Sequence, residues 1–208
     1  MGDYTVIIGD VCGSRRMNPD ARYEGQLFIK SAISQINENF RDCVEAPFTI
    51  TRGDEFQGVL NKKRFVLPLI LEFERLLFPL NLRYGVGSGY IQRMGSDLPL
   101  EMDGQAFHRG SEALQSAKKK KMQIVYKSDD PRYDRLINAL FLLMYAIKSR
   151  WNQSNFERYW RYKELGTYEK VADYENVSTQ AVWDSLQNMR AQEIIQSEQA
   201  VIEYLSST

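Results

Sequence analysis

The sequence has little of what defines several large protein classes. It contains only two cysteines, Cys12 and Cys43, too few for a disulfide framework. Its most apolar run, Leu136 to Ile147, is too short to span a bilayer. The first four residues lead directly into a strand pattern, without the features of a signal peptide. We therefore expect a cytoplasmic globular protein with no membrane partner.

The charge balance also excludes a class of function. Formal net charge is zero, which argues against a general polyanion binder. The charge is unevenly distributed, because residues 151–208 hold five Lys/Arg against nine Asp/Glu, a formal charge of −4 that leaves +4 for the rest. With 208 residues, 43% of them hydrophobic, the chain has room for one domain of good size and a small appendage.

Hydrophobic patterns predict alternating strands and helices in the first two thirds of the chain. The first six elements follow the split βαβ order of a ferredoxin-like domain. They are expected at residues 4–8 (strand), 23–40 (helix), 48–60 (hairpin of two strands), 62–78 (helix) and 82–91 (strand). A helix at 104–119 and a strand at 122–126 follow, and everything after residue 132 is helical in character. The predicted fold class is α+β: a ferredoxin-like palm domain (βαββαβ plus an extra helix and strand) at 1–128, then an all-α domain at 129–208.

Two aspartates stand at turns that this topology brings together. Asp10 ends the first strand, and Asp54 lies in the hairpin turn. Right-handed crossovers place the first strand beside the hairpin, so the two carboxylates can converge. Such a pair is a hard-oxygen site of the kind Mg²⁺ or Mn²⁺ prefers, and backbone N–H groups at Gly13 and Ser14 could hold phosphates. The alternative is a turn that carries two surface acids.

Four ordered motifs carry a resemblance to known families. Residues 9–15, Gly-Asp-Val-Cys-Gly-Ser-Arg, resemble the first metal motif of class III nucleotidyl cyclases. Gly53-Asp54-Glu55-Phe56 resembles the second metal motif of the cyclases and the hairpin of GGDEF domains, with Arg52 in place of the first glycine. Residues 82–89 and 103–107 are similar to a cyclase strand and to the start of a cyclase helix. The cyclase resemblance covers residues 4–127, and the whole chain is similar to the SatD family.

The resemblance implies a metal-dependent, nucleotide-binding palm domain: a nucleotidyl cyclase, a nucleotidyltransferase-like protein or a degenerate sensor of that class. It implies metal ligation by Asp10 and Asp54, and it implies that a nucleoside triphosphate or other nucleotide meets a set of four residues: Gly13, Ser14, Arg15 and Arg109. The cyclase helix carries an Asn and an Arg where this sequence has His108 and Glu112, and a carboxylate cannot stabilise developing phosphate charge as an arginine does. No catalytic residue is therefore assigned. Because cyclases and GGDEF enzymes complete their sites across two chains, the resemblance also makes a homodimer worth testing.

The C-terminal third fits a helix-turn-helix at residues 167–191. Ser178 is a good N-cap, and Val177 is expected to seat the turn. The second helix should bury one face, made of Ala181, Val182, Leu186 and Met189. It should expose polar groups for DNA or a protein partner, among them Thr179, Gln180, Gln187 and Asn188. No Lys or Arg lies between Ser178 and Met189, so the acidic tail disfavours DNA.

Two functions of different class remain open. The first is a nucleotide-handling palm domain with a regulatory tail. The second is a transcriptional regulator or partner-binding protein whose palm domain is non-catalytic. Nucleotide binding without turnover favours the second, and product formation establishes the first.

Overall fold

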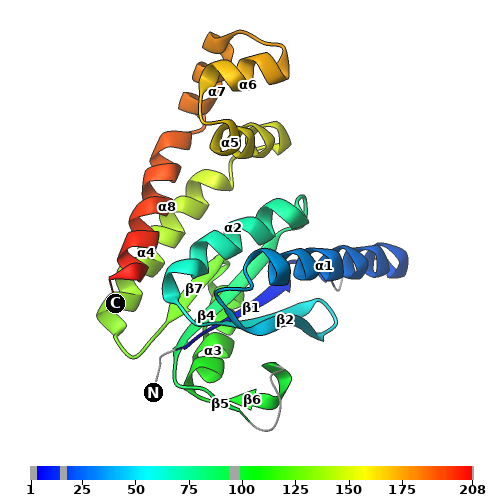
Figure 1. Ribbon diagram of the computed structural model, residues 1–208, viewed down its shortest axis with the longest axis vertical. Helices are drawn as coiled ribbons and strands as arrows, with labels where there is room; N and C mark the ends of the chain where they lie inside the picture. The colour runs from blue at the N-terminus through cyan, green and yellow to red at the C-terminus, as the bar shows by residue number, and fades with distance from the viewer. Residues whose placement is uncertain (1–3, 15–17, 94–98, 208) are drawn as a thin grey trace. The chain divides into compact units, whose positions relative to one another are not determined.

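The computed structural model describes residues 4–14, 18–93 and 99–207 (Figure 1). The chain divides into two compact units. Leu143–Ala200 form the second unit, and the remaining residues form the first. The division falls inside two long helices, α4 (Pro131–Lys148) and α8 (Ala191–Ser206), whereas the predicted domain boundary at 128/129 lies in the loop before α4.

A five-stranded mixed sheet forms the centre of the first unit, in the order β2-β3-β1-β4-β7. The strands are β1 (Tyr4–Val11), β2 (Val44–Arg52), β3 (Glu55–Leu60), β4 (Leu82–Gly89) and β7 (Ile124–Lys127). Neighbours are antiparallel except β4 and β7, which are parallel. The predicted placement of the first strand beside the hairpin is confirmed, with β1 at the centre between the hairpin strand β3 and β4.

Helices cover both faces of this sheet (Figure 1). On one face lie α1 (Pro19–Asn39) and α2 (Val66–Leu77), where Phe73 of α2 meets Phe56 of β3 with ring centroids 4.7 Å apart. On the other face lies α3 (Gln105–Lys120), whose Gly110 packs on Val6 and Ile8 of β1. Residues of β1 therefore alternate between the α1/α2 face and the α3 face.

Glycines in β4 let the backbone of α3 approach the sheet. A β-carbon on Gly85 would lie 2.3 Å from the Gly110 carbonyl oxygen, and one on Gly87 would lie 2.2 Å from the Ala106 carbonyl oxygen. Real side chains never reach such distances, so only glycine allows this packing. Because α3 begins where β4 ends, with Ala106 N–H donating to the Tyr90 carbonyl, its C-terminal turn reaches the Arg83 end of β4.

Smaller elements refine the predicted boundaries. The helix expected from residue 62 begins with a 3₁₀ turn at Lys63–Phe65, and Pro68 occupies the first turn of α2, where proline is tolerated. The loop expected between residues 93 and 103 contains the short strands β5 (Gln92–Arg93) and β6 (Met102–Asp103), with a 3₁₀ turn at Pro99–Glu101. None of the helices in the described ranges is long and apolar enough to cross a membrane.

The second unit is built from helices with well-formed caps. Between α4 and α8 lie α5 (Gln153–Leu165), α6 (Tyr168–Glu175) and α7 (Thr179–Asn188). Asn152, Thr167 and Ser178 cap α5, α6 and α7 through side-chain oxygens that accept backbone N–H groups. Residues 176–178 join α6 to α7, and Asn176 adopts a left-handed conformation at φ 54°.

The buried face of α7 differs from the prediction at two places. Val182, Leu186 and Met189 are buried as expected, but Ala181 is exposed and Val177 is 41% exposed. Ala181 instead lines an open groove, and in the turn the Val177 N–H donates to the Ala172 carbonyl while Ser178 caps α7. The prediction placed four residues on one buried stripe, whereas α7 packs along a narrower one.

Candidate functional site

The end of β1 gathers charged side chains from three elements. Asp10 pairs in register with Glu55 of β3 on one side and with Arg83 of β4 on the other. Residues directly opposite in antiparallel strands project to the same face. Asp10 and Glu55 therefore stand side by side on the α3 face, an arrangement that is unfavourable for two like charges without a cation.

Lys118 of α3 supplies a cation to these two carboxylates. Its Nζ lies 2.9 Å from Asp10 Oδ1 and 3.8 Å from Glu55 Oε2. The Asp10 side chain is 16% exposed and that of Lys118 is 40% exposed. This pair is more sheltered than an ordinary surface salt bridge, and it exists because α3 lies close against β4.

Asp54 comes to the same end of the sheet but has different neighbours. It lines a small cavity together with Val11, Ser14 and Gln26. Its Oδ2 atom is buried and accepts no hydrogen bond from any residue within 4–14, 18–93 or 99–207. A buried, unsatisfied carboxylate oxygen is costly, and a water or ion beside it would remove that cost.

The loop after Asp10 contributes the predicted phosphate-binding positions. Gly13 adopts a left-handed backbone at φ 79°, and a β-carbon on it would meet nothing within 4 Å. Ser14 is buried and lines the same cavity as Asp54. Ser14 thus lies beside Asp54, Gly13 lies three residues after Asp10 in the chain, and Arg15 lies outside the described residues.

Burial shapes the titration of this cluster. Burial raises the pKa of the Glu55 carboxyl, and the Lys118 charge offsets part of that rise. Burial likewise raises the pKa of the Cys12 thiol, which Arg83 partly counteracts. A raised thiol pKa keeps Cys12 protonated at neutral pH, in line with its interpretation as a small hydrophobe and not a nucleophile.

Arg109 lies at the opposite end of the sheet from Asp10. Its Nη1 donates to the Ser88 carbonyl at 2.6 Å, and Ser88 pairs with Thr5. Thr5 lies five positions before Asp10 in β1, about 16 Å of extended strand. The exposed His108 lies 3.3 Å from Asp103, and Glu112 accepts from Lys127 at 2.7 Å. The structure therefore does not bring Arg109 to Asp10 and Asp54 within one chain.

The sequence alone does not single out two members of the cluster, Lys118 and Glu55. The signal available for Glu55 is the alternation of side chains along β3. A residue of β3 lies on the same face as the β1 residue that pairs with it, which for Glu55 is Asp10. Nothing in the run of four lysines distinguishes Lys118.

The donor chemistry of the cluster fits a divalent cation such as Mg²⁺. No group of three or more His, Cys, Asp or Glu suited to a metal occurs in the part of the chain that the structure describes. Mg²⁺ uses one or two protein carboxylates and takes its other oxygens from water and phosphates, so a complete protein cage is not required. The carboxylates that would hold such an ion are those of Asp54, with its unpartnered oxygen, and of Asp10 and Glu55.

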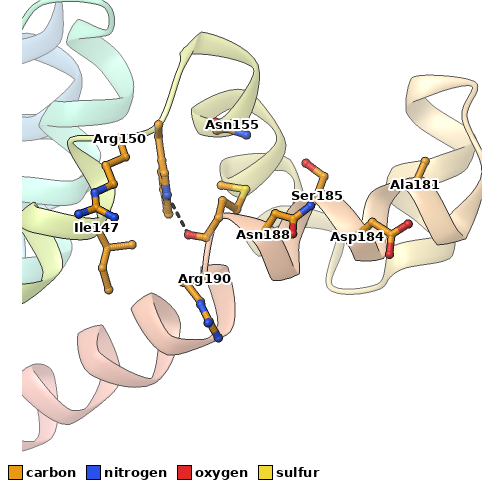
Figure 2. A pocket seen from close by; sticks show the side chains of 10 residues that line it. Ile147, Arg150, Asn155, Ala181, Asp184, Ser185, Asn188 and Arg190 are labelled. Carbon is orange, nitrogen blue, oxygen red and sulfur yellow. Dashed lines mark hydrogen bonds between the residues drawn. The ribbon is translucent and has the colours of Figure 1, made fainter.

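A second candidate site lies on the helical unit. An open groove of about 720 Å³ runs along α7 (Figure 2). Its apolar floor includes Trp151, whose Nε1 donates to the Met189 carbonyl at 2.9 Å. Figure 2 shows Arg150 and Arg190 toward one end and Asp184 toward the other. Of the four predicted contact residues, Asn188 lines this groove, Thr179 and Gln180 are exposed on α7, and Gln187 is partly buried.

These features define a class: an α+β protein with a palm-type sheet, an acidic cluster at the end of its central strand and a helical C-terminal part. The SatD family model matches residues 4–196, and the chain belongs to the SatD family. No curated protein matches the sequence.

Several solved structures are similar at low identity. A bacterial light-regulated adenylyl cyclase gives a TM-score of 0.44 at 14% identity, over 60% of this chain and 43% of that chain. A second structure of a bacterial light-regulated adenylyl cyclase gives 0.43 at 17% identity, over 60% and 75%. The catalytic core of a rhodopsin-guanylyl cyclase in complex with ATPalphaS gives 0.43 at 17% identity, over 55% and 72%. This chain thus spans less than half of the first of these proteins.

Proposed function

We propose that the first compact unit, called the palm unit below, binds a nucleoside triphosphate or other nucleotide together with Mg²⁺ or Mn²⁺. The binding site would lie at the end of the sheet that carries Asp10 and Asp54. The observation that supports this most is the buried Oδ2 atom of Asp54, which no described residue satisfies. A cation beside it would remove the cost of that burial. When bound, the metal would neutralise phosphate charge between the carboxylates and the nucleotide.

The loop at Gly13 and Ser14 supports the nucleotide half of the proposal. The left-handed Gly13 turns the backbone directly beyond Asp10, where N–H groups in such turns form anion-binding concavities. Ser14, buried beside Asp54, places a hydroxyl in the same cavity. Arg15 completes the motif in sequence and is proposed as a third phosphate contact.

Arg109 fits this function only from a second chain. Arg109 contacts the end of the sheet near Thr5, and the separation of Thr5 from Asp10 along β1 exceeds the reach of one arginine side chain. A nucleotide at Asp10 would therefore meet the Arg109 of another copy. A homodimer is therefore part of the proposal. Equilibrium sedimentation with and without Mg²⁺-nucleotide would test it, and a strictly monomeric complex would remove Arg109 from the site.

Thermal melts of single-carboxylate variants test the central proposal. Asp10→Asn and Asp54→Asn should fold, because each removes a charge from a crowded acidic cluster. Mg²⁺-ATP or Mg²⁺-GTP should raise the free energy of unfolding of the wild type by about 2.7 kcal/mol at a nucleotide concentration of 100 times Kd. Its melting temperature should rise accordingly. Both variants should lose this shift, while Asp103→Asn, an exposed acid at the distant end, should keep it. An equal shift in all four proteins would contradict the proposal, and chromatography of the nucleotide products would separate binding from turnover.

We propose, second, that α6 and α7 form a helix-turn-helix module that regulates the palm unit or contacts a protein partner. Three large apolar side chains are exposed around its turn: Tyr174, Val177 and Trp183. Exposed apolar side chains clustered on one small surface often mark an interaction site. If the module regulates the nucleotide site, a chain carrying Tyr174→Ala and Trp183→Ala should bind Mg²⁺-nucleotide with a changed affinity. Unchanged affinity would exclude regulation through this surface.

A further inference from the structure

Lys118 occupies a position that the proposed metal ion would need. It stands in the last full turn of α3, and the glycines of β4 bring that turn down onto the sheet. Its ammonium contacts the Asp10 carboxylate at 2.9 Å and approaches Glu55 at 3.8 Å. A divalent ion bound to Asp10 would face this ammonium at short range, and the two positive charges would repel each other.

The same ammonium also stabilises the site in the absence of a metal. Asp10 and Glu55 are paired in register on the same face, so their like charges lie side by side. Lys118 offsets this repulsion by supplying a positive charge from inside the chain. Binding a divalent ion at Asp10 therefore means exchanging one cation for another.

The Lys118 ammonium is able to move away from Asp10. Its side chain is 40% exposed and stands near the end of the helix, where the long flexible stem can turn its ammonium into water. Lys119, the next residue, is exposed and makes no ion pair with any residue that the structure describes. The two lysines carry the same charge on the same turn, but only Lys118 meets the carboxylates.

We propose that Lys118 is the residue that sets the cation affinity of this site: its ammonium is a built-in counter-cation that must release Asp10 before a divalent ion can bind there. This inference rests on the proposed metal-nucleotide function. A divalent ion then binds Asp10 only at a metal concentration high enough to displace the Lys118 ammonium. Without the ion, Asp10 keeps its ion pair with Lys118.

The test measures Mn²⁺ binding to the full chain without nucleotide, by electron paramagnetic resonance of free Mn²⁺. Lys118→Met removes the ammonium and keeps most of the stem, and Lys119→Met is the matched control for overall charge. Lys118→Met should bind Mn²⁺ about tenfold more tightly than wild type, which corresponds to about 1.4 kcal/mol, while Lys119→Met should equal wild type. Lys118→Arg, which holds a carboxylate with two parallel hydrogen bonds, should bind Mn²⁺ more weakly than wild type.

A double variant locates the effect. Adding Asp10→Asn to Lys118→Met should abolish the gained affinity, because the freed carboxylate is then gone. Equal Mn²⁺ affinity in wild type, Lys118→Met and Lys118→Arg would overturn this inference and leave the proposed function standing. Gained affinity that survives Asp10→Asn would also overturn it. Failure of every protein to bind Mn²⁺ at millimolar concentration would overturn both.

Discussion

The β-carbon that Gly87 lacks would lie 2.2 Å from the amide nitrogen of Gly110. Two glycines, one in β4 and one in α3, thus meet backbone to backbone at the centre of the palm unit. The contact fixes how deeply α3 sits on the sheet. The depth and axial position of α3 in turn decide which residue of its last turn reaches Asp10.

Gly87→Ala should therefore destabilise the protein and disturb the site. Overpacking of this kind costs about 1–3 kcal/mol, and more when the obstructing atoms are backbone, as here. Urea unfolding followed by circular dichroism would measure the loss. Gly25→Ala is the control, because its added methyl group in α1 would meet nothing within 4 Å and should stabilise the helix by about 0.5–1 kcal/mol. Equal stability of Gly87→Ala and wild type would show that α3 does not depend on this contact.

An ion-pair cluster in the helical unit should make stability depend on pH. Glu175 accepts hydrogen bonds from Arg158 and Arg161, and the Arg158 Nε contact measures 2.8 Å. Burial acts to raise the pKa of Glu175, but the hydrogen bonds and charges of the two arginines outweigh it and hold the pKa below the ordinary value of 4.5. Because the folded state favours the charged carboxylate, its contribution to stability is full above the unfolded pKa and is lost as pH falls through the folded pKa.

Glu175→Gln should lower the free energy of unfolding by about 1.5–3 kcal/mol at neutral pH, the range for hydrogen bonds to charged groups. The difference from wild type should shrink as pH falls below about 4.5. Denaturant melts at a series of pH values would measure it. Glu193→Gln breaks the exposed pair with Arg190, with side chains 47% and 67% exposed, and should change stability far less than Glu175→Gln does. A difference for Glu175→Gln that stays constant with pH would contradict the electrostatic explanation.

The order of the elements could be predicted because each has a local signal. An unalternating apolar run such as residues 4–8 is typical of a strand buried on both faces, and glycines within a strand, such as Gly85 and Gly87, are typical of a close backbone approach, which α3 makes. The composition of the charged cluster could not be predicted in the same way. Which of four successive lysines meets Asp10 depends on the axial position of α3 over β4. That position is a property of the packed structure and not of the local sequence.

The partner of Asp10 shows the same limit. Sequence placed Asp54 at the turn nearest to it, and the structure brings both to one end of the sheet. The strand register, however, sets Asp10 opposite Glu55, the residue after Asp54. A shift of one residue exchanges the face on which a side chain lies, so this detail requires the register itself. The shared metal ligation of Asp10 and Asp54 stays a prediction.

The two faces of α7 should respond differently to truncation. Leu186 is fully buried, and Leu186→Ala should destabilise the helical unit by about 2–5 kcal/mol. Trp183 is 43% exposed, and Trp183→Ala should cost far less although it removes a larger side chain. Thermal melts of the full chain would compare the two. A large loss from Trp183→Ala would mean that its indole is covered, for instance by another copy of the chain.

The last prediction concerns DNA. Phosphate neutralisation dominates the affinity of most DNA-binding proteins, and each phosphate contact requires a donor, usually Lys or Arg. The candidate recognition helix α7 exposes Thr179, Gln180 and Asn188 but contains no cation, and residues 151–208 carry five basic against nine acidic residues. Four of the five basic side chains are already paired with acids: Arg158 and Arg161 with Glu175, Lys163 with the buried Glu198, and Arg190 with Glu193.

The full chain should therefore bind duplex DNA weakly or not at all at physiological salt. A mobility-shift assay with a pool of random duplexes, followed by selection, would measure both affinity and sequence preference. A weak interaction that vanishes between about 50 and 200 mM salt would be non-specific attraction to the basic residues of the palm unit. Asp184→Lys on α7 is the informative variant, since it adds a cation on the exposed face and should strengthen such binding. Sub-micromolar, sequence-selective binding by the wild type would instead favour a transcriptional regulator whose palm unit senses a ligand.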